Sequence, residues 1–267
     1  MACLATHSHW ARNIENNVSG IRPYFHLTNE DERILMKWMR DYGKKIVNAS
    51  IIMEEKRWRK MLHSMKYLPK IIGENLKLWW FDYLGSFQLT DVIPKTSLHE
   101  SICFIQYLLN QAVLTDSTLW AAKFELQRNI TLAYDLATLE MESEWQNVQG
   151  FKAILNPSFS MQCFNHMILG IISEVSSDGF NHENVYLAFY KNRITGMVCV
   201  VKMSEILRWI VSKVPDSPEL STLISVISNT FNIKYESVLS LIRTMVKNDV
   251  IAIEKRKSPC LSNQIPI

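Results

Sequence analysis

The sequence has few of the residues and patterns on which common catalytic sites depend. Only 8 glycines occur among 267 residues, too few for a glycine-laced nucleotide-binding fold. The motifs GxSxG, GxxxxGKS/T and HExxH do not occur, so the usual signatures of serine hydrolases, P-loop proteins and zinc proteases are missing. No uncharged apolar run reaches the length of about 18 residues that a membrane span needs, and the N-terminus does not resemble a signal peptide. We therefore expect no membrane partner.

Cysteine is present, but not in a pattern that binds metal or builds a disulfide framework. The five cysteines are Cys3, Cys103, Cys163, Cys199 and Cys260. Their number is odd, no CxxC pair occurs, and the three central ones lie in apolar stretches. These features are typical of reduced thiols and predict a cytoplasmic protein.

The charge balance is not that of a dedicated nucleic-acid-binding protein. Hydrophobic residues make up 48% of the chain and charged residues 21%, as in a globular protein. The formal net charge is only +3, whereas a nucleic-acid-binding domain usually carries a dense basic face. The length allows one large domain or two modest ones, each with its own core.

Apolar residues at helical spacing predict an all-α bundle in the N-terminal part of the chain. Thr28, followed three residues later by Asp31, has the pattern of a helix N-cap. Ser97 is the expected cap of a later helix, and a long helix is predicted over about residues 116–147. Residues 1–26 show no firm period and are predicted to be loop.

The pattern changes after residue 155. Val185, Leu187 and Phe189 are spaced by two, which predicts a strand. The chain is expected to turn at residues 191–193 and to return as a second, nearly apolar strand, forming a hairpin. The stretch before the hairpin, residues 161–175, could be a strand or a short helix.

The order of elements predicts a mainly α protein with a small β element (α+β). Three helical segments follow the hairpin and end in a short strand at residues 251–253. Three helices with strands at their rim are typical of a winged helix-turn-helix arrangement. We therefore predict a helical bundle over residues 1–155 and a winged-helix-like peptide-recognition domain over residues 156–267.

Two groups of potential metal ligands are present, and neither has the spacing of a known site. Cys3, His7 and His9 lie close together at the N-terminus, where a metal clip and a head with incidental histidines are the two alternatives. His99 and Cys103 are four residues apart and share a helical face, but two ligands do not make a site.

The clustered carboxylates are not a pattern for acid-base catalysis either. Glu140, Glu142 and Glu144 are spaced by two, so they cannot share one helical face. They are typical of charges that face solvent. We expect no catalytic residue, no metal and no cofactor in this chain.

A DNA-binding transcriptional regulator is one interpretation of the C-terminal domain. The last predicted helix would then lie in the major groove, with Arg243 and Lys247 as its cations. Lys191 and Arg193 of the hairpin would act as a wing. Four cations are few for phosphate binding, so nucleic acid is not the partner that we favour.

An extended peptide suits the same residues better. Such a peptide can add to an open sheet edge as one more strand, with main-chain hydrogen bonds fixing its register. Short hydroxyl side chains on the helix would leave room for the guest backbone, and the cations would pair with acidic guest residues. The residues predicted to bind the peptide are Val198, Val200, Ser240, Arg243, Thr244 and Lys247. A hairpin edge that is covered by the bundle is the alternative.

Tryptophan also suggests a protein partner. Trp79 and Trp80 are adjacent on a predicted helix and cannot both face the same core. Either one of them lies at a protein interface, where tryptophan is enriched, or the helix is buried on both sides. The residues predicted to contact a partner enzyme are Trp79, Trp80, Trp120 and Glu125.

Two stretches of the sequence resemble a known family. The matching residues are Asp135, Leu136, Ala137, Leu139 and Glu140 on a bundle helix, and Tyr186, Leu187, Tyr190 and Gly196 in the hairpin. Over roughly residues 70–255, the chain resembles the partner proteins of DUF692-type TIM-barrel iron enzymes, in particular those of methanobactin biosynthesis. The motifs do not cover residues 1–60.

This resemblance implies a recognition subunit without a catalytic centre. Proteins of the family bind a DUF692-type (MbnB-like) iron enzyme, and the pair captures the leader of a ribosomally made (MbnA-like) precursor peptide. The iron centre of the enzyme then uses dioxygen to convert precursor cysteines into oxazolone and thioamide groups. The resemblance thus places iron in the partner enzyme and peptide recognition in the C-terminal domain of this chain.

Overall fold

The computed structural model describes residues 7–16, 19, 22–88, 91–111, 114–136, 148–173, 184–217 and 219–255. Within these ranges the protein is mainly α-helical with a small β element, which confirms the predicted α+β class. The helices are α2 (Ser8–Asn16), α3 (Arg22–Phe25), α4 (Asn29–Ser64), α5 (Leu68–Ile72), α6 (Asn75–Ser86), α7 (Ser97–Leu109), α8 (Asp116–Ala133), α9 (Met167–Ser173), α10 (Glu205–Lys213), α11 (Leu220–Phe231) and α12 (Tyr235–Lys247). The strands are β1 (Phe151–Leu155), β2 (Ser160–Asn165), β3 (Asn184–Lys191), β4 (Val198–Lys202) and β5 (Ile251–Lys255). Among the described residues, no helix combines the length and apolarity that crossing a bilayer requires.

The chain divides into two compact units. The N-terminal unit comprises residues 1–129 and 167–180, and the C-terminal unit comprises residues 130–166 and 181–267. The sequence instead predicted a single boundary between residues 155 and 156. The chain returns to the N-terminal unit at α9, where Ile171 packs against the apolar core of the bundle. Such a return depends on contacts between residues far apart in sequence, which local patterning does not contain.

The N-terminal unit is a helical bundle built around the long helix α4. Thr28 caps α4 as predicted, because its Oγ1 accepts from Asp31 N at 3.2 Å while a carboxylate oxygen of Asp31 accepts from Thr28 N at 3.0 Å. Residues predicted to be loop form α2, which packs on α4 with Ala11 and Ile14 buried. The loop prediction was therefore wrong for this segment.

The other predicted helix ends differ from the structure to different degrees. Thr96 caps α7, one residue before the expected Ser97, by accepting from His99 N at 3.1 Å. The helix α8 begins near the predicted position but ends at Ala133, well before residue 147. Residues 137–147, with Glu140, Glu142, Glu144 and most of the bundle-helix motif, lie outside the described residues.

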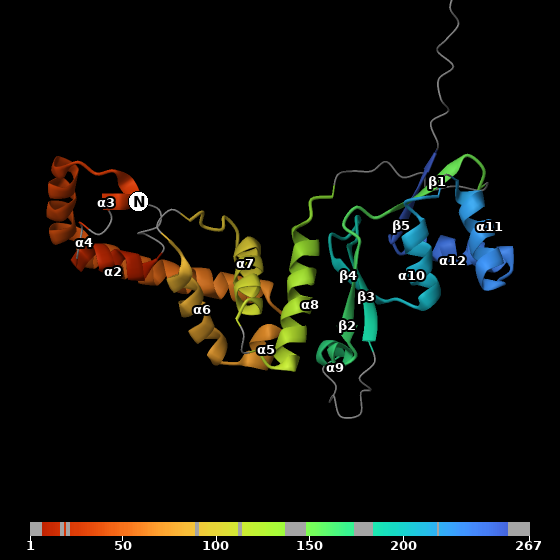
Figure 1. Ribbon diagram of the computed structural model, residues 1–267, viewed down its shortest axis with the longest axis horizontal. Coiled ribbons are helices and arrows are strands. Elements are labelled where there is room, and N and C mark those ends of the chain that lie inside the picture. The colour runs from red at the N-terminus through yellow and green to blue at the C-terminus, as the bar shows by residue number, and fades with distance from the viewer. Residues whose placement is uncertain are drawn as a thin grey trace, which may run out of the picture. The chain divides into compact units, whose positions relative to one another are not determined.

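The C-terminal unit combines three helices with two small antiparallel sheets. One sheet has the order β2-β3-β4, and the other pairs β1 with β5 (Figure 1). The stretch that could be strand or helix forms both, as β2 and α9. Ser204 caps α10 as predicted, with its Oγ accepting from Leu207 N at 3.3 Å.

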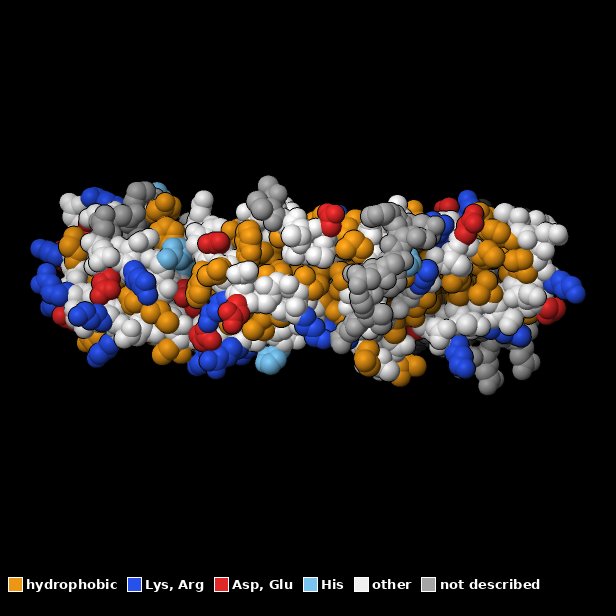
Figure 2. Space-filling model, turned by 90° about the horizontal axis from the view of Figure 1, so that it is seen from below, with side chains coloured by type: hydrophobic (Ala, Val, Ile, Leu, Met, Phe, Trp, Pro, Cys, Tyr) orange, Lys and Arg blue, Asp and Glu red, His pale blue; other side chains and the backbone are white. Residues whose placement is uncertain are grey.

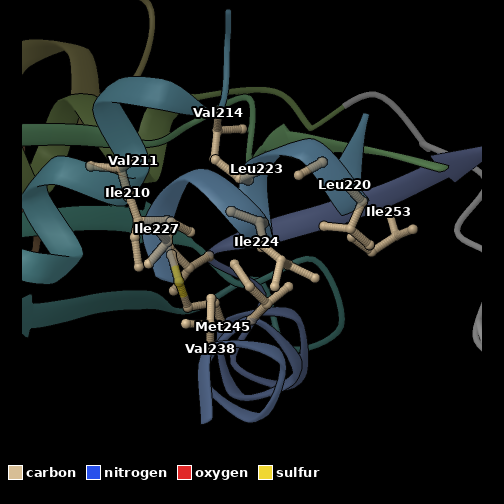
Figure 3. Close-up of a cluster of buried hydrophobic side chains, with 14 of the residues drawn as sticks. Ile210, Val211, Val214, Leu220, Leu223, Ile224, Ile227, Val238, Met245 and Ile253 are labelled. Carbon is tan, nitrogen blue, oxygen red and sulfur yellow. The ribbon is translucent and has the colours of Figure 1, made fainter. Parts of the chain in front are cut away.

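Apolar side chains of the three helices and of β5 form the core of the C-terminal unit (Figure 3). Ile210 from α10, Ile224 from α11 and Ile242 from α12 are fully buried, and Ile253 joins them from β5. Burying each such side chain contributes roughly 1.5–3 kcal/mol. This core fixes the position of β1, which the sequence did not predict, because Ala153 of β1 belongs to it.

Candidate functional site

The strand β4 lies at the rim of the three-stranded sheet. Its register on β3 pairs Phe189 with Val200 and Lys191 with Val198. Within the described ranges, β4 pairs with no strand other than β3. A strand with one unpaired side presents main-chain donors and acceptors to whatever lies beside it.

The hydrogen bonds at both ends of β4 show which of its residues face outward. Asn192 N donates to Met197 O at 2.8 Å, and Met203 N donates to Tyr186 O at 2.8 Å. Bonded and non-bonded positions alternate in an antiparallel ladder, so positions 199 and 201 also bond to β3. The N–H and C=O groups of Val198, Val200 and Lys202 therefore point away from the sheet. We call this side of the strand the β4 edge.

The side chains of β4 alternate between the two faces of the sheet. Cys199 and Val201 pack with Tyr190 and Ala188 against the core of the C-terminal unit. Val198 and Val200 lie on the opposite face and are half-buried. The predicted peptide-binding valines thus combine an outward-pointing main chain with an apolar surface.

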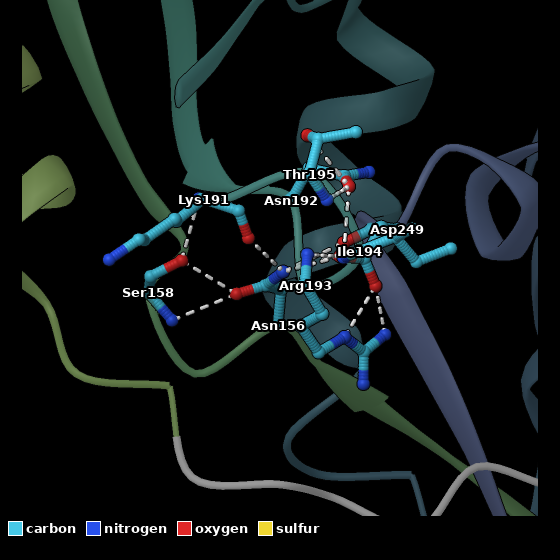
Figure 4. Close-up of polar contacts among 8 residues, drawn as sticks. All are labelled: Asn156, Ser158, Lys191, Asn192, Arg193, Ile194, Thr195 and Asp249. Carbon is cyan, nitrogen blue, oxygen red and sulfur yellow. Dashed lines mark hydrogen bonds and ion pairs between the residues drawn. The ribbon is translucent and has the colours of Figure 1, made fainter. Parts of the chain in front are cut away.

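The turn before β4 is held by a dense set of hydrogen bonds (Figure 4). Asn192 Oδ1 accepts from Ile194 N at 3.1 Å and from Thr195 N at 2.9 Å. Arg193 forms an ion pair with Asp249, which also accepts from Arg193 N at 2.7 Å. These bonds give β4 a fixed starting point.

Asn156 and Ser158, which follow β1 in the chain, extend this set of hydrogen bonds to β3 (Figure 4). Asn156 Nδ2 donates to Lys191 O and to Asp249 O, both at 3.0 Å. Ser158 Oγ accepts from Lys191 N at 2.8 Å and donates to Asn156 Oδ1 at 2.7 Å. Asn156, Ser158 and Asp249 are all buried, and sequence reasoning found none of them. Only the contact between Ser158 and Asn156 is local; the bonds to Lys191 and Asp249 join residues distant in sequence, which a local pattern does not show.

Both hairpin cations of the DNA hypothesis are bonded within the chain. Lys191 Nζ donates to Leu132 O and Tyr134 O at 3.0 Å each. The side chain of Arg193 is only 11% exposed, and its guanidinium is paired with Asp249. A DNA-binding wing needs cations that reach phosphates, so these contacts weigh against that hypothesis.

The four residues predicted on the last helix occupy the outer side of α12. Ser240, Arg243, Thr244 and Lys247 are all exposed. Thr244 Oγ1 donates to Ser240 O at 2.9 Å within the helix. The opposite side of α12 packs against α11 and β5. The structure thus places Val198 and Val200 together on an open edge and the other four on a separate helix surface.

Two of the four predicted partner-enzyme contacts lie inside the bundle. Trp80 is 1% exposed and packs against Trp58 and Phe104, with ring centroids 5.8 Å apart in each pair. Glu125 is fully buried and accepts from Lys66 N at 2.9 Å and Tyr67 N at 2.6 Å. The prediction that Trp80 and Glu125 contact a partner enzyme was therefore wrong, because neither side chain is available to another protein.

The other two predicted contacts are partly exposed. Trp79 is half-buried. Its neighbours in sequence differ, because Leu78 is 63% exposed and Trp80 belongs to the core. Trp120 lies under Lys123 Nζ, 4.6 Å from its ring centroid. Phe81 is a further exposed side chain on α6 that sequence reasoning missed. On the face shown in Figure 2, apolar side chains lie among charged ones.

The described residues contain no group of three His, Cys, Asp or Glu side chains that could hold a metal ion. Cys3 lies outside the described residues. His9 stands close to Trp10, and burial lowers its pKa, partly offset by Glu54. Burial, with the charge of Glu100, raises the pKa of Cys103.

No family model and no curated protein matches this sequence.

Proposed function

We propose that this chain is the non-catalytic, peptide-recognition subunit of a cytoplasmic complex that modifies a ribosomally made precursor peptide. The observation that carries the proposal is the β4 edge, a ladder at the rim of a sheet that no other described strand pairs with. The residues of the hairpin and of the bundle-helix motif support the proposal, because they resemble those of the partner proteins of DUF692-type iron enzymes. In this proposal the iron and the chemistry belong to that enzyme, which oxidises cysteines of the precursor to oxazolone and thioamide groups.

The guest peptide would add to β4 as a fourth strand of the sheet. The main-chain groups of Val198, Val200 and Lys202 would bond to it, each bond contributing about 0.5–1.5 kcal/mol net. Because the turn at Asn192 and Arg193 is already fixed, β4 itself loses little conformational entropy when a guest binds. Apolar guest side chains would rest against the half-buried valines.

The exposed apolar side chains of α6 suit the partner enzyme. Leu78 and Phe81 are exposed and lie three residues apart on α6, so they share one side of the helix. Trp79 is half-buried and packs against the bundle core, and Trp120 is a further partly exposed aromatic residue. Tryptophan and other large apolar side chains are enriched where interfaces are strongest. The interface is proposed for these residues and no longer for Trp80 and Glu125.

Substitution of Val200 by proline tests the proposed edge directly. The amide of Val200 points away from β3, so proline there removes a donor for the guest without removing a bond of the sheet. We expect Val200→Pro to weaken binding of a methanobactin-type precursor peptide about two- to tenfold, the equivalent of one lost bond. The matched control, Val200→Thr, keeps the amide and the shape and should bind nearly as the parent does.

Three outcomes decide between the hypotheses. Equal binding by the proline and threonine variants would place the peptide elsewhere. Failure of the parent chain to bind either the precursor or a DUF692-type enzyme would refute the proposal. Salt-sensitive, sequence-specific retardation of DNA in a gel would instead favour the transcriptional regulator.

A further inference from the structure

Exposed apolar side chains from two helices of the N-terminal unit border a single contact. In that contact, Lys77 Nζ of α6 donates to Glu55 Oε2 of α4 at 3.1 Å. Ile51 and Ile52, both exposed, precede Glu55 by four and three residues on α4. Phe81, also exposed, follows Lys77 by four residues on α6. Residues three or four apart are neighbours on a helix surface, so the apolar side chains of both helices lie beside this contact.

A fourth apolar residue belongs to the same surface. Leu78 is exposed and lies three residues before Phe81 on α6. Lys77 Nζ lies 6.0 Å from the centroid of the Phe81 ring, so the contact with α4 and the apolar side of α6 are continuous. We call Ile51, Ile52, Leu78 and Phe81 the α4–α6 surface. Single exposed apolar side chains are normal, whereas exposed apolar residues that gather together mark interaction sites.

The centre of the α4–α6 surface carries more positive than negative charge. Besides Lys77, Glu55 accepts a hydrogen bond from Arg59 Nε at 3.2 Å. The hydrogen bonds from Lys77 and from Arg59 lower the pKa of Glu55, so the carboxylate stays ionised at neutral pH. One carboxylate is thus shared by two cations, which leaves a net positive charge between the apolar side chains.

The side of α4 that carries Ile51 is also positively charged. Arg40 and Lys44 precede Ile51 by eleven and seven residues, which are about three and two helical turns, so the three residues share one side of the helix. Both cations are exposed. Asp41 is the only carboxylate in the sequence of residues 33–53. The excess of positive charge therefore extends along α4 from the α4–α6 surface.

The charges at α6 have the opposite sign and limit what can cover the whole surface. Leu78 lies four residues from Glu74 and four from Asp82, and both carboxylates are exposed. An anionic lipid surface would be repelled by these carboxylates, and a second copy of this chain would bring the same cations to α4. A protein suits the surface better, with an apolar centre and with carboxylates placed only opposite α4.

We infer that the partner enzyme covers the α4–α6 surface as a whole, with carboxylates of the enzyme facing Arg40 and Lys44. The inference rests on the proposed function, which placed the enzyme on α6, and it adds α4 to the interface. The motifs that resemble the known family do not cover residues 1–60, so the part of α4 before residue 60 is assigned by its exposed side chains and charges alone.

Titration of the full chain with a purified DUF692-type enzyme, followed by calorimetry, tests this inference. Ile51→Asp should weaken binding about tenfold, because an apolar contact is lost and a carboxylate is placed against carboxylates. Met53→Asp is the matched control. Met53 is 40% exposed and Ile51 is 39% exposed, but residues two apart point to different sides of a helix. The Met53→Asp variant should therefore bind the enzyme as the parent chain does.

A charge reversal on α4 gives a second, independent measurement. Lys44→Glu should slow association with the enzyme about threefold at low salt, and the difference should shrink at high salt because salt screens the charges. Lys60→Glu is the control, because Lys60 is an exposed lysine of the same helix that lies seven residues after Met53 and shares its side. Its association rate should stay close to that of the parent chain.

The outcomes separate this inference from the proposed function. If the parent chain does not bind the enzyme, the proposed function fails, and the inference that rests on it fails too. If the parent chain binds and the Ile51→Asp and Met53→Asp variants bind equally well, α4 lies outside the interface and only the inference is overturned. It is also overturned if Ile51→Asp leaves enzyme binding unchanged but disrupts a dimer of this chain or its binding to vesicles of anionic phospholipid.

Discussion

Replacing Asp249 by alanine should both destabilise the C-terminal unit and release the turn before β4. One carboxylate oxygen accepts from Arg193 Nε at 2.5 Å, and the other accepts from Arg193 N at 2.7 Å. The two side chains are 11% and 9% exposed, so the ion pair is largely shielded from water. Asp249 also has a left-handed backbone, with φ of 63°, which aspartate tolerates better than alanine.

The expected loss of stability in Asp249→Ala comes from the guanidinium of Arg193, which stays buried without its partner. Removing one partner of a buried ion pair costs about 3–5 kcal/mol, because the remaining charge stays buried without compensation. The combination of Arg193→Met with Asp249→Asn removes both charges and keeps a side chain that tolerates the left-handed backbone. We therefore expect the double variant to be more stable than Asp249→Ala, although it lacks the ion pair.

Native-state hydrogen exchange at amides of β3 and β5 measures these differences within the C-terminal unit alone. Asp216→Ala is the matched control, because Asp216 is an exposed aspartate of the same unit. Asp216→Ala should change the free energy of unfolding by no more than about 0.5 kcal/mol. A loss below about 1 kcal/mol for Asp249→Ala, or a double variant less stable than Asp249→Ala, would show that the buried pair is not what holds the turn.

Three further predictions concern buried side chains. Trp80→Ala should cost about 3–5 kcal/mol in chemical denaturation, whereas Trp79→Ala should cost less and instead weaken binding of the partner enzyme, and the reverse order would contradict both placements. Glu125→Ala should cost at least about 2 kcal/mol, because the amides of Lys66 and Tyr67 lose their acceptor and that of Tyr67 is buried, and Glu125→Gln should cost less because it keeps one acceptor oxygen. Burial, with the neighbouring Cys199 and Asp249, raises the pKa of Tyr190 to about 12. Its neutral form therefore contributes stability that is complete below the usual tyrosine pKa of about 10 and is lost as the pH rises toward 12, and Tyr190→Phe should remove this part of the alkaline loss in a pH series of denaturation curves.

Local signals in the sequence predicted the hairpin and two helix caps correctly. The cap at Thr28 and the cap at Ser204 are both present, because each depends only on residues within one helical turn. The alternation around Leu187 likewise identified β3, whose side chains face two different surroundings. The outward direction of Val198 and Val200 follows from the same local register.

The remaining features depend on partners that are distant in the chain. The strand β1 escaped prediction because it is short and its partner β5 lies at the other end of the unit. Glu125 was assigned to a surface because nothing near it in sequence shows that the amides of Lys66 and Tyr67 need an acceptor. The adjacent residues Trp79 and Trp80 indicated that one faces inward, but the phase of α6 is set only by packing on Trp58 and Phe104.

The pairing of β1 with β5 also bears on how the protein is made. The ribosome releases β1 long before β5, and β2, β3, β4, α10, α11 and α12 emerge between them. The sheet that closes this unit can therefore form only when synthesis has passed residue 255, while most of the N-terminal bundle has already left the exit tunnel. A nascent chain arrested before that point would expose both sides of β1, and it is at this stage that the protein would depend most on chaperones.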